Sequence, residues 1–219
     1  MRIFGLTGSI ATGKSLVSHH LKELGAFIID YDVISKKVVK PGFLAWQDIV
    51  GYFGKDILNE DRTIDRVKLG NIIFNDETKR KKLEFFTHIR IAEEINNEEK
   101  AILSSNPHAI VIHDAPLLFE ANVHKFKNFE KIIVVYANEK TQLKRLKERD
   151  GISEEDALIR IRAQFPFEEK VKLADFIIDN NGSIENTKRQ VEKVYHALCS
   201  HTKHNKEEKW KIQTNGKQS

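Results

Sequence analysis

The stretch IFGLTGSIATGKSLVSHHL, residues 3–21, decides the fold of this chain of 219 residues. Gly8, Gly13, Lys14 and Ser15 complete the pattern G-x-x-x-x-G-K-[ST], which follows an apolar run and precedes a run with helical periodicity. A strand, a glycine-containing loop and a helix in this order form a phosphate-binding loop. Successive backbone N–H groups and the positive end of the helix then surround an oligophosphate. We therefore predict a binding site for a nucleoside triphosphate.

Each residue type in this loop has a chemical reason. The two glycines allow backbone angles and a close approach of phosphate that a Cβ atom would obstruct. Lys14 is expected to be accessible to solvent without ligand and to reach the β- and γ-phosphates, while the Ser15 hydroxyl ligates Mg²⁺. The predicted ATP site includes Gly8, Ser9, Ile10, Ala11, Thr12, Gly13, Lys14 and Ser15.

Five short apolar runs predict buried parallel strands, because they are rich in Ile, Val and Phe and lack strict alternation. They are RIFGLT (2–7), AFIID (26–30), AIVIHD (109–114), KIIVVYA (131–137) and DFIID (175–179). Amphipathic helical patterns lie between them, notably at 15–24, 141–149 and 187–198. This alternation predicts an α/β three-layer sandwich with a parallel five-stranded sheet, the P-loop NTPase fold.

Two longer segments interrupt the alternation of strands and helices. Residues 33–107 are mostly helical in pattern and predict a substrate-binding insertion. The charged helical segment at about 151–172 predicts a mobile lid, and the polar, Lys-rich residues 201–219 predict a frayed tail. We expect residues 1–200 to form a single P-loop domain that carries this insertion and lid.

Composition limits the function classes. Lys and Arg number 36 against 32 Asp and Glu, and the net charge of +4 is scattered among acidic residues. Such mild basicity suits a small anionic substrate at least as well as nucleic acid, and we expect no nucleic-acid partner. No run of about 18 apolar residues offers a membrane span. The single cysteine, Cys199, excludes an internal disulfide and favours a reducing, cytoplasmic location. Among the nine histidines, the pairs His19–His20 and His201–His204 lack a Cys or carboxylate partner at metal-ligand spacing, which favours solvated or core histidines.

The loop by itself is compatible with a kinase, a GTPase, a motor ATPase or a nucleotide switch. The chain has no N-K-x-D segment of the kind that guanine-specific GTPases use, and it is short for the larger ATPases. A small-molecule kinase is therefore the leading class. Such an enzyme needs a group that orients the acceptor hydroxyl, an arginine-bearing lid and a pocket for the acceptor.

Asp30 and Asp32 follow the second predicted strand, at the sheet edge where open α/β folds bind ligands. Asp32 could orient and deprotonate an acceptor hydroxyl, or it could cap a helix that starts near Val33. Taken alone, the sequence leaves both roles open. Asp30 lies two residues earlier and competes with Asp32 for the catalytic role.

Two arginines and one more aspartate complete the candidate site. Arg145 and Arg149 are four residues apart on a predicted helix that runs into the lid, so their guanidinium groups could meet the transferring phosphoryl group. A solvated helix face is the alternative for such a pair. Asp114 ends an apolar strand beside the phosphate loop, a position that organises Mg²⁺ in P-loop enzymes.

These motifs together resemble the dephospho-coenzyme A kinase family from Ile3 to about Leu198. The resemblance rests on the order and spacing of GLTGSIATGKS (5–15), IIDYDVISKKVVKPG (28–42), PLLFE (116–120), TQLKRLKERD (141–150), RIRAQFP (160–166) and ADFIIDNNG (174–182). It implies transfer of a phosphoryl group from ATP, with Mg²⁺, to the ribose 3′-hydroxyl of dephospho-coenzyme A, the last step of coenzyme A synthesis. It also implies a nucleoside-monophosphate-kinase-like core, a helical coenzyme A domain and a lid.

The resemblance assigns roles residue by residue. Thr7 and the loop from Gly8 to Ser15 match the family's ATP site, Asp32 matches its acceptor-orienting aspartate and Arg145 its phosphate-clamping arginine. The predicted catalytic residues are accordingly Asp32, Lys14 and Arg145, with Arg149 and Asn180 added to the ATP site and Ser15 and Asp114 to the metal site. We expect a monomer or a weak homo-oligomer that does not bind membranes.

The chain departs from the family pattern in two places. In FFTHIRIAEEI (85–95) the family has His-Pro and then an Arg, whereas His88 is followed here by Ile89, and Ala92 stands where that Arg would fall. Either Arg90 substitutes for the missing Arg or the acceptor binds more weakly. Ser9 also stands where glycine is common in the family's loop.

Overall fold

The computed structural model describes residues 1–200, so the tail predicted for residues 201–219 lies outside the described residues. The chain divides into two compact units. Within the described residues, 1–28 and 108–200 form the first, which we call the core unit. Ile29–Pro107 form the second, which we call the insertion unit.

A parallel sheet carries the core unit, and all five predicted strands are confirmed. Within residues 1–200 its strand order is β2-β3-β1-β4-β5, with β1 paired in parallel to both β3 and β4, and β4 to β5. The central position of β1 explains why its sequence is apolar and buried along most of its length. The strands are β1 (Arg2–Gly8), β2 (Phe27–Asp30), β3 (Ile110–Asp114), β4 (Lys131–Tyr136) and β5 (Phe176–Asp179).

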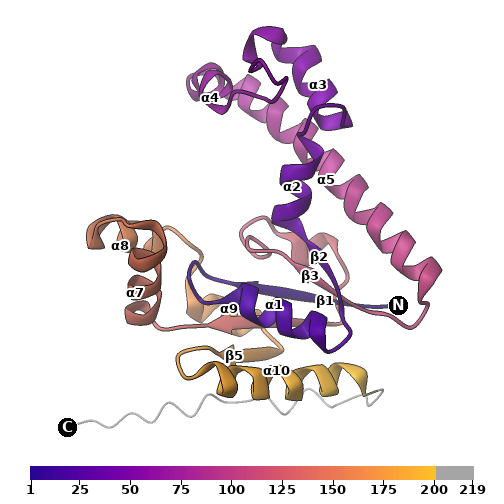
Figure 1. Cartoon of the computed structure of the whole chain (residues 1–219), viewed down its shortest axis with the longest axis vertical. Helices are drawn as coiled ribbons and strands as arrows, with labels where there is room; N and C mark the ends of the chain where they lie inside the picture. The colour runs from indigo at the N-terminus through magenta and orange to yellow at the C-terminus, as the bar shows by residue number, and fades with distance from the viewer. Residues whose placement is uncertain (201–219) are drawn as a thin grey trace. The chain divides into compact units, whose positions relative to one another are not determined.

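Helices cover both faces of this sheet, as the alternation along β4 shows. Ile133 and Val135 pack into a buried cluster with side chains of α1 (Lys14–Glu23) and α10 (Ile184–Cys199). Neighbouring positions on a strand point to opposite faces. Tyr136 therefore faces the other way, where it stacks on Phe167 of α9 (Phe167–Leu173) with ring centroids 4.1 Å apart. Figure 1 shows α1 and α10 together along one side of the sheet.

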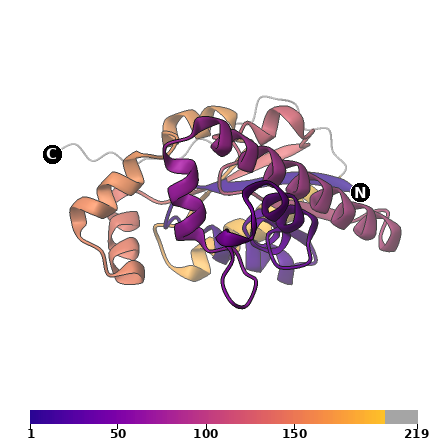
Figure 2. The same ribbon diagram turned by 90° about the horizontal axis from the view of Figure 1, so that it is seen from above.

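Three further helices complete the core unit within residues 1–200. They are α6 (Val123–Phe126), α7 (Glu139–Asp150) and α8 (Glu154–Arg162). Helices α7 and α8 pack against each other, and the turned view of Figure 2 shows them as the orange-brown pair. The predicted lid, 151–172, corresponds to α8, the connection after it and most of α9.

The insertion unit is helical, as the sequence predicts. It contains α2 (Tyr31–Val38), α3 (Leu44–Phe53), the 3₁₀ turn η1 (Lys55–Ile57), α4 (Arg66–Phe74) and α5 (Glu77–Ser105). The long helix α5 packs against α2, α3 and α4. A small buried cluster of Ile49, Ile57 and Leu69 packs α3, η1 and α4 together. None of the helices within residues 1–200 is long and apolar enough to cross a bilayer.

Candidate active site

The phosphate loop lies between β1 and α1, and both of its glycines are required by their surroundings. Gly13 has φ +85°, in the left-handed region, and a Cβ there would lie 2.1 Å from Nδ2 of Asn180. A Cβ on Gly8 would lie 2.7 Å from Oγ1 of Thr12 and 3.0 Å from the carbonyl oxygen of Val135. Neither position has room for a side chain.

Two threonines hold the main chain at the ends of this loop. The hydroxyl of Thr12 donates to the carbonyl oxygen of Ser9 at 2.8 Å, and the Thr12 N–H donates to the same oxygen at 3.2 Å. Thr7 is fully buried, and its hydroxyl donates to the carbonyl oxygen of Pro116 at 3.1 Å. Thr7 therefore supports the strand end that leads into the loop, and its part in ATP binding stays a prediction.

Lys14 forms an ion pair with Asp114 at the carboxyl end of β3. Only 15% of the Lys14 side chain and 3% of the Asp114 side chain are exposed. The expectation that Lys14 is freely accessible without ligand is therefore wrong, because the buried Asp114 carboxylate attracts the ammonium group. The pair keeps a cation at the start of α1, beside the loop amides.

Ser15 and Asp114 were predicted to hold Mg²⁺. The Ser15 side chain is exposed in the first turn of α1, and the Asp114 carboxylate is paired with the Lys14 ammonium group. Residues 1–200 contain no group of three or more His, Cys, Asp and Glu side chains that could hold a metal ion. One hydroxyl and one carboxylate instead fit a Mg²⁺ that takes its other ligands from nucleotide phosphates and water.

A side-chain network holds the carbonyl edge of the phosphate loop. Arg145, from α7, donates to the carbonyl oxygens of Asn180 at 2.8 Å and of Thr12 at 3.3 Å, and its longer contact to that of Ala11 measures 3.5 Å. The Asn180 side chain donates to the same Thr12 carbonyl at 2.7 Å and accepts from the Thr187 hydroxyl at 2.8 Å. With its carbonyl groups held on this side, the loop can direct N–H groups toward an anion.

Arg149 does not take part in this network. Its guanidinium group donates to both carboxylate oxygens of Asp150, at 2.7 and 3.1 Å, and Arg160 approaches the same carboxylate at 3.3 Å. The neighbouring Arg149 holds the pKa of the Asp150 carboxyl below its usual range. Arg149 is thus part of an exposed ion-pair cluster where α7 ends, and its predicted role in ATP binding stays a prediction.

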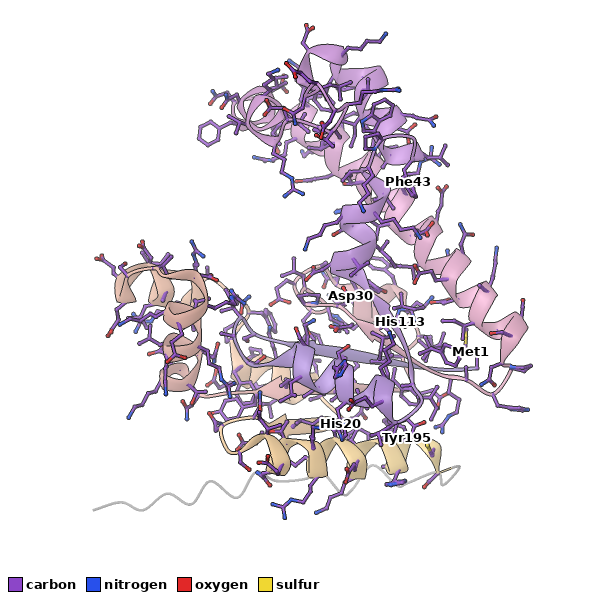
Figure 3. The ribbon with its side chains drawn as sticks, viewed as in Figure 1. Met1, His20, Asp30, Phe43, His113 and Tyr195 are labelled. Atoms are coloured by element: carbon purple, nitrogen blue, oxygen red, sulfur yellow. The ribbon has the colours of Figure 1, made fainter. Side chains whose placement is uncertain are left out.

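In the insertion unit the structure separates the two aspartates that the sequence left in competition. Asp30, labelled in Figure 3, is the N-cap of α2, and its Oδ1 accepts from the N–H groups of Asp32 at 2.9 Å and Val33 at 3.0 Å. Asp32 lies in the first turn of the helix with an exposed side chain. The alternative that Asp32 serves as the cap is therefore wrong, and its carboxylate is free of that task.

A cavity of about 830 Å³ lies inside the insertion unit, among α2, α3, α4, α5 and the segment before α4. Five apolar side chains and three exposed cations, Lys36, Lys40 and Arg66, line it together with the carboxylates Asp65 and Glu84. The apolar lining consists of Val39, Ile49, Ile64, Leu69 and Leu83. Such a cavity suits a ligand with an apolar arm and an anionic group.

Arg90, proposed as a substitute for a missing family arginine, is already paired. Its Nε donates to Asp48 at 2.7 Å and its Nη1 to Glu93 at 2.8 Å, all within the insertion unit. These two carboxylates raise the pKa of the Arg90 guanidinium above its usual value. An acceptor would have to compete with both carboxylates for this group, so the substitution by Arg90 stays a hypothesis.

The family model described as CoaE, dephospho-CoA kinase, matches residues 2–186. The chain belongs to the dephospho-CoA kinase family. It is 51% identical over 189 residues to the dephospho-CoA kinase of Carboxydothermus hydrogenoformans, which covers 86% of this chain and 90% of that protein. It is 46% identical over 190 residues to the enzyme of Listeria innocua, covering 87% of this chain and 94% of that one.

Solved structures agree with this membership of the family. The dephospho-CoA kinase from Campylobacter jejuni is 34% identical with a TM-score of 0.66, and the match covers 91% of this chain and 98% of that one. A protein from Thermus thermophilus is 29% identical with a TM-score of 0.72 over 90% and 97% of the two chains. Shikimate kinase from Acinetobacter baumannii, at 20% identity and a TM-score of 0.50, shares the kinase fold alone.

The sequence analysis missed two contacts of the site. Thr187, which orients the Asn180 side chain, carried no motif signal because its partner depends on how α10 packs against the sheet. Gln164 lies in the RIRAQFP segment that supported the resemblance, yet nothing in that segment showed that its side chain meets Ile10 of the phosphate loop. The sequence thus identified the segment that contains Gln164, but not the contact that its side chain makes.

Proposed function

We propose that this protein transfers the γ-phosphoryl group of ATP to the ribose 3′-hydroxyl of dephospho-coenzyme A, giving coenzyme A and ADP. The observation that carries the proposal is the phosphate loop, held by Arg145 and Asn180 and carrying the Lys14–Asp114 pair, in a chain of the dephospho-CoA kinase family. The loop binds and polarises the triphosphate, which is the part of phosphoryl transfer that a protein contributes most.

On the donor side the loop amides and Lys14 stabilise negative charge on the β- and γ-phosphates. Lys14 is kept at the start of α1 by Asp114 until the nucleotide offers a stronger anionic partner. The Ser15 hydroxyl and the Asp114 carboxylate are the side chains that would hold Mg²⁺, which would supply charge neutralisation at the phosphate oxygens. Arg145 fixes the shape of the loop, and we assign it charge compensation in the transition state as well.

On the acceptor side we assign Asp32 the role of orienting the hydroxyl and accepting its proton. The bond from the 3′-oxygen to the γ-phosphorus forms while the bond from that phosphorus to the bridging oxygen of ADP breaks, and the hydroxyl proton passes to the carboxylate. An exposed aspartate without a capping task supports this role. Because phosphoryl transfer has a loose transition state, positioning matters at least as much as basicity.

We assign the cavity of the insertion unit to the acceptor. Dephospho-coenzyme A combines an adenosine, a diphosphate and a long arm with apolar segments. The apolar lining suits the arm, and Lys36, Lys40 and Arg66 suit the diphosphate. The single cysteine of the chain supports a reducing compartment, from which we infer a cytoplasmic location.

One assay tests the proposal. The purified protein is mixed with ATP, Mg²⁺ and dephospho-coenzyme A, and the release of ADP is followed, with adenosine, AMP and shikimate as comparison acceptors. We expect turnover with dephospho-coenzyme A to exceed that with each comparison acceptor by orders of magnitude in kcat/KM. Equal or faster turnover of a comparison acceptor would assign the same kinase machinery to another substrate.

A further inference from the structure

The connection between α8 and α9 makes a direct contact with the phosphate loop. The side-chain oxygen Oε1 of Gln164 accepts a hydrogen bond from the backbone N–H of Ile10 at 2.6 Å. Ile10 is the third residue of the G-x-x-x-x-G-K-[ST] loop, whose N–H groups are the ligands of phosphate. One of the amides at the edge of this loop is thus held by a side chain from the base of the predicted lid.

The segment that carries Gln164 is anchored on both sides. Before it, the Ala163 N–H continues the hydrogen bonding of α8 by donating to the Ile159 carbonyl at 3.0 Å. After it, the N–H of Phe165 approaches Oε1 of Glu120 at 3.4 Å. The Gln164 side chain therefore extends from main chain whose place is set by α8 and by the PLLFE segment.

A buried ion pair strengthens this anchor. Lys170, on α9, has no exposed surface, and its Nζ lies 2.9 Å from the same Oε1 of Glu120. A fully buried ammonium group is tolerated only beside an anion, so Lys170 ties α9 to Glu120. Together, Phe165 and Lys170 place both ends of the 165–170 segment on one carboxylate.

The chemistry of a carboxamide also matters at this position. Its oxygen is used by Ile10, while in the part of the chain that the structure describes its NH₂ group donates to no protein acceptor. Glutamine loses substantial rotamer freedom when it is fixed, so an ordinary surface glutamine would gain little from one such bond. The short hydrogen bond from the Ile10 N–H to Gln164, which lies in an anchored segment, indicates that the Gln164 side chain sets the position of the phosphate loop at Ile10.

We propose that Gln164 is a positioning residue for phosphoryl transfer, which fixes the Ile10 edge of the phosphate loop against the base of the lid through its carboxamide oxygen. The proposal deepens the proposed function and rests on it for the kinetic measurements. It does not require Gln164 to touch the substrate.

The test compares Gln164→Leu, which removes the acceptor, with Gln164→Glu, which keeps an oxygen acceptor at the same reach. Glu168→Ala is the control, because Glu168 is an exposed residue of the adjoining helix. We expect Gln164→Leu to lower kcat about 10- to 100-fold, the effect of a small misplacement of reacting groups. Gln164→Glu should keep kcat within about fivefold of wild type and raise the KM for ATP, because its charge repels the triphosphate. The control should match wild type.

Amide hydrogen exchange at Ile10, measured by NMR on the enzyme without nucleotide, gives a readout that does not depend on the acceptor. Exchange should be faster in Gln164→Leu than in wild type and Gln164→Glu, because only the leucine variant loses the acceptor. Unchanged exchange or a wild-type kcat in Gln164→Leu overturns the proposal. Equal loss of kcat in both variants also overturns it, since the amide NH₂ would then act directly. If wild type does not phosphorylate dephospho-coenzyme A but Ile10 exchange changes as expected, the proposed function fails and the Gln164–loop link stands.

Discussion

The phosphate loop and the insertion unit prepare for their ligands in different ways. In the loop, the carbonyl groups are held by Arg145 and Asn180, and the cation Lys14 is kept by a buried carboxylate. In the insertion unit, the candidate acceptor groups Asp32 and Arg66 are exposed. The loop is thus held in place before ATP arrives, whereas we expect the exposed groups of the insertion unit to be ordered by their ligand. Substitutions in the first region should change stability and catalysis together, and those in the second should change kinetics alone.

The largest effect is expected for Lys14→Ala. Loss of the cation should lower kcat by about 10³- to 10⁵-fold, the range for a positive group on a transferring phosphoryl. It should also lower the melting temperature by several degrees, because the buried Asp114 loses its cation. Steady-state kinetics and thermal unfolding measure the two effects.

The double variant Lys14→Ala/Asp114→Asn is the matched control for this change. It removes both charges, so we expect it to regain melting temperature without regaining activity. An active Lys14→Ala enzyme would contradict the phosphate-loop assignment. A single variant that melts like wild type would show that the loop is less prearranged than the ion pair implies.

Asp32→Asn tests the insertion unit by the same two measurements, kcat and the melting temperature. We expect kcat to fall by about 10²- to 10⁴-fold, the usual worth of a positioned acid or base, with little change in the KM values. The melting temperature should not change, because Asp32 is exposed and does not cap α2.

Asp30→Asn is the control for Asp32→Asn, since it changes the N-cap itself. Asparagine caps as well as aspartate, so this variant should be close to wild type in both activity and melting. A loss of kcat in Asp30→Asn as large as that in Asp32→Asn would move the catalytic role to Asp30.

Arg145→Ala and Arg145→Lys sharpen the comparison inside the core unit. The planar guanidinium serves several carbonyl oxygens that an ammonium group cannot reach together, so both variants should lower kcat by about 10- to 100-fold. Affinity for ATP, measured by calorimetry, should change less than kcat, because charge on the phosphoryl group is greatest in the transition state. A change confined to the KM for ATP would make Arg145 a binding residue alone.

The smallest effects are expected at the cavity of the insertion unit. Lys36→Ala and Arg66→Ala should each raise the KM for dephospho-coenzyme A about two- to fivefold, the worth of an exposed ion pair, without changing the KM for ATP. Lys68→Ala is the control, because this exposed lysine of α4 does not line the cavity. Wild-type kinetics in both variants would place the acceptor elsewhere.

Much of the fold followed from local patterns. Each of the five strands was predicted because an apolar, β-branched run can be recognised without knowing its partner, as KIIVVYA shows. The helix that follows the loop was predicted to begin at Ser15 and begins at Lys14. Among the candidate residues, Lys14 and Asp114 form an ion pair, because β1 and β3 are neighbouring strands. Arg149 instead pairs with Asp150, the next residue in the chain.

By itself the sequence determined the phosphate loop, the strands and the helical insertion, because glycine conformation and hydrophobic periodicity act over a few neighbouring residues. Only the tertiary structure decided which side chains hold the loop. Arg145 and Asn180 reach its carbonyl groups, and Gln164 reaches the Ile10 amide, across 133 to 168 residues of chain. Such partners are chosen by the strand order and by the direction of each side chain after packing, which no local pattern contains.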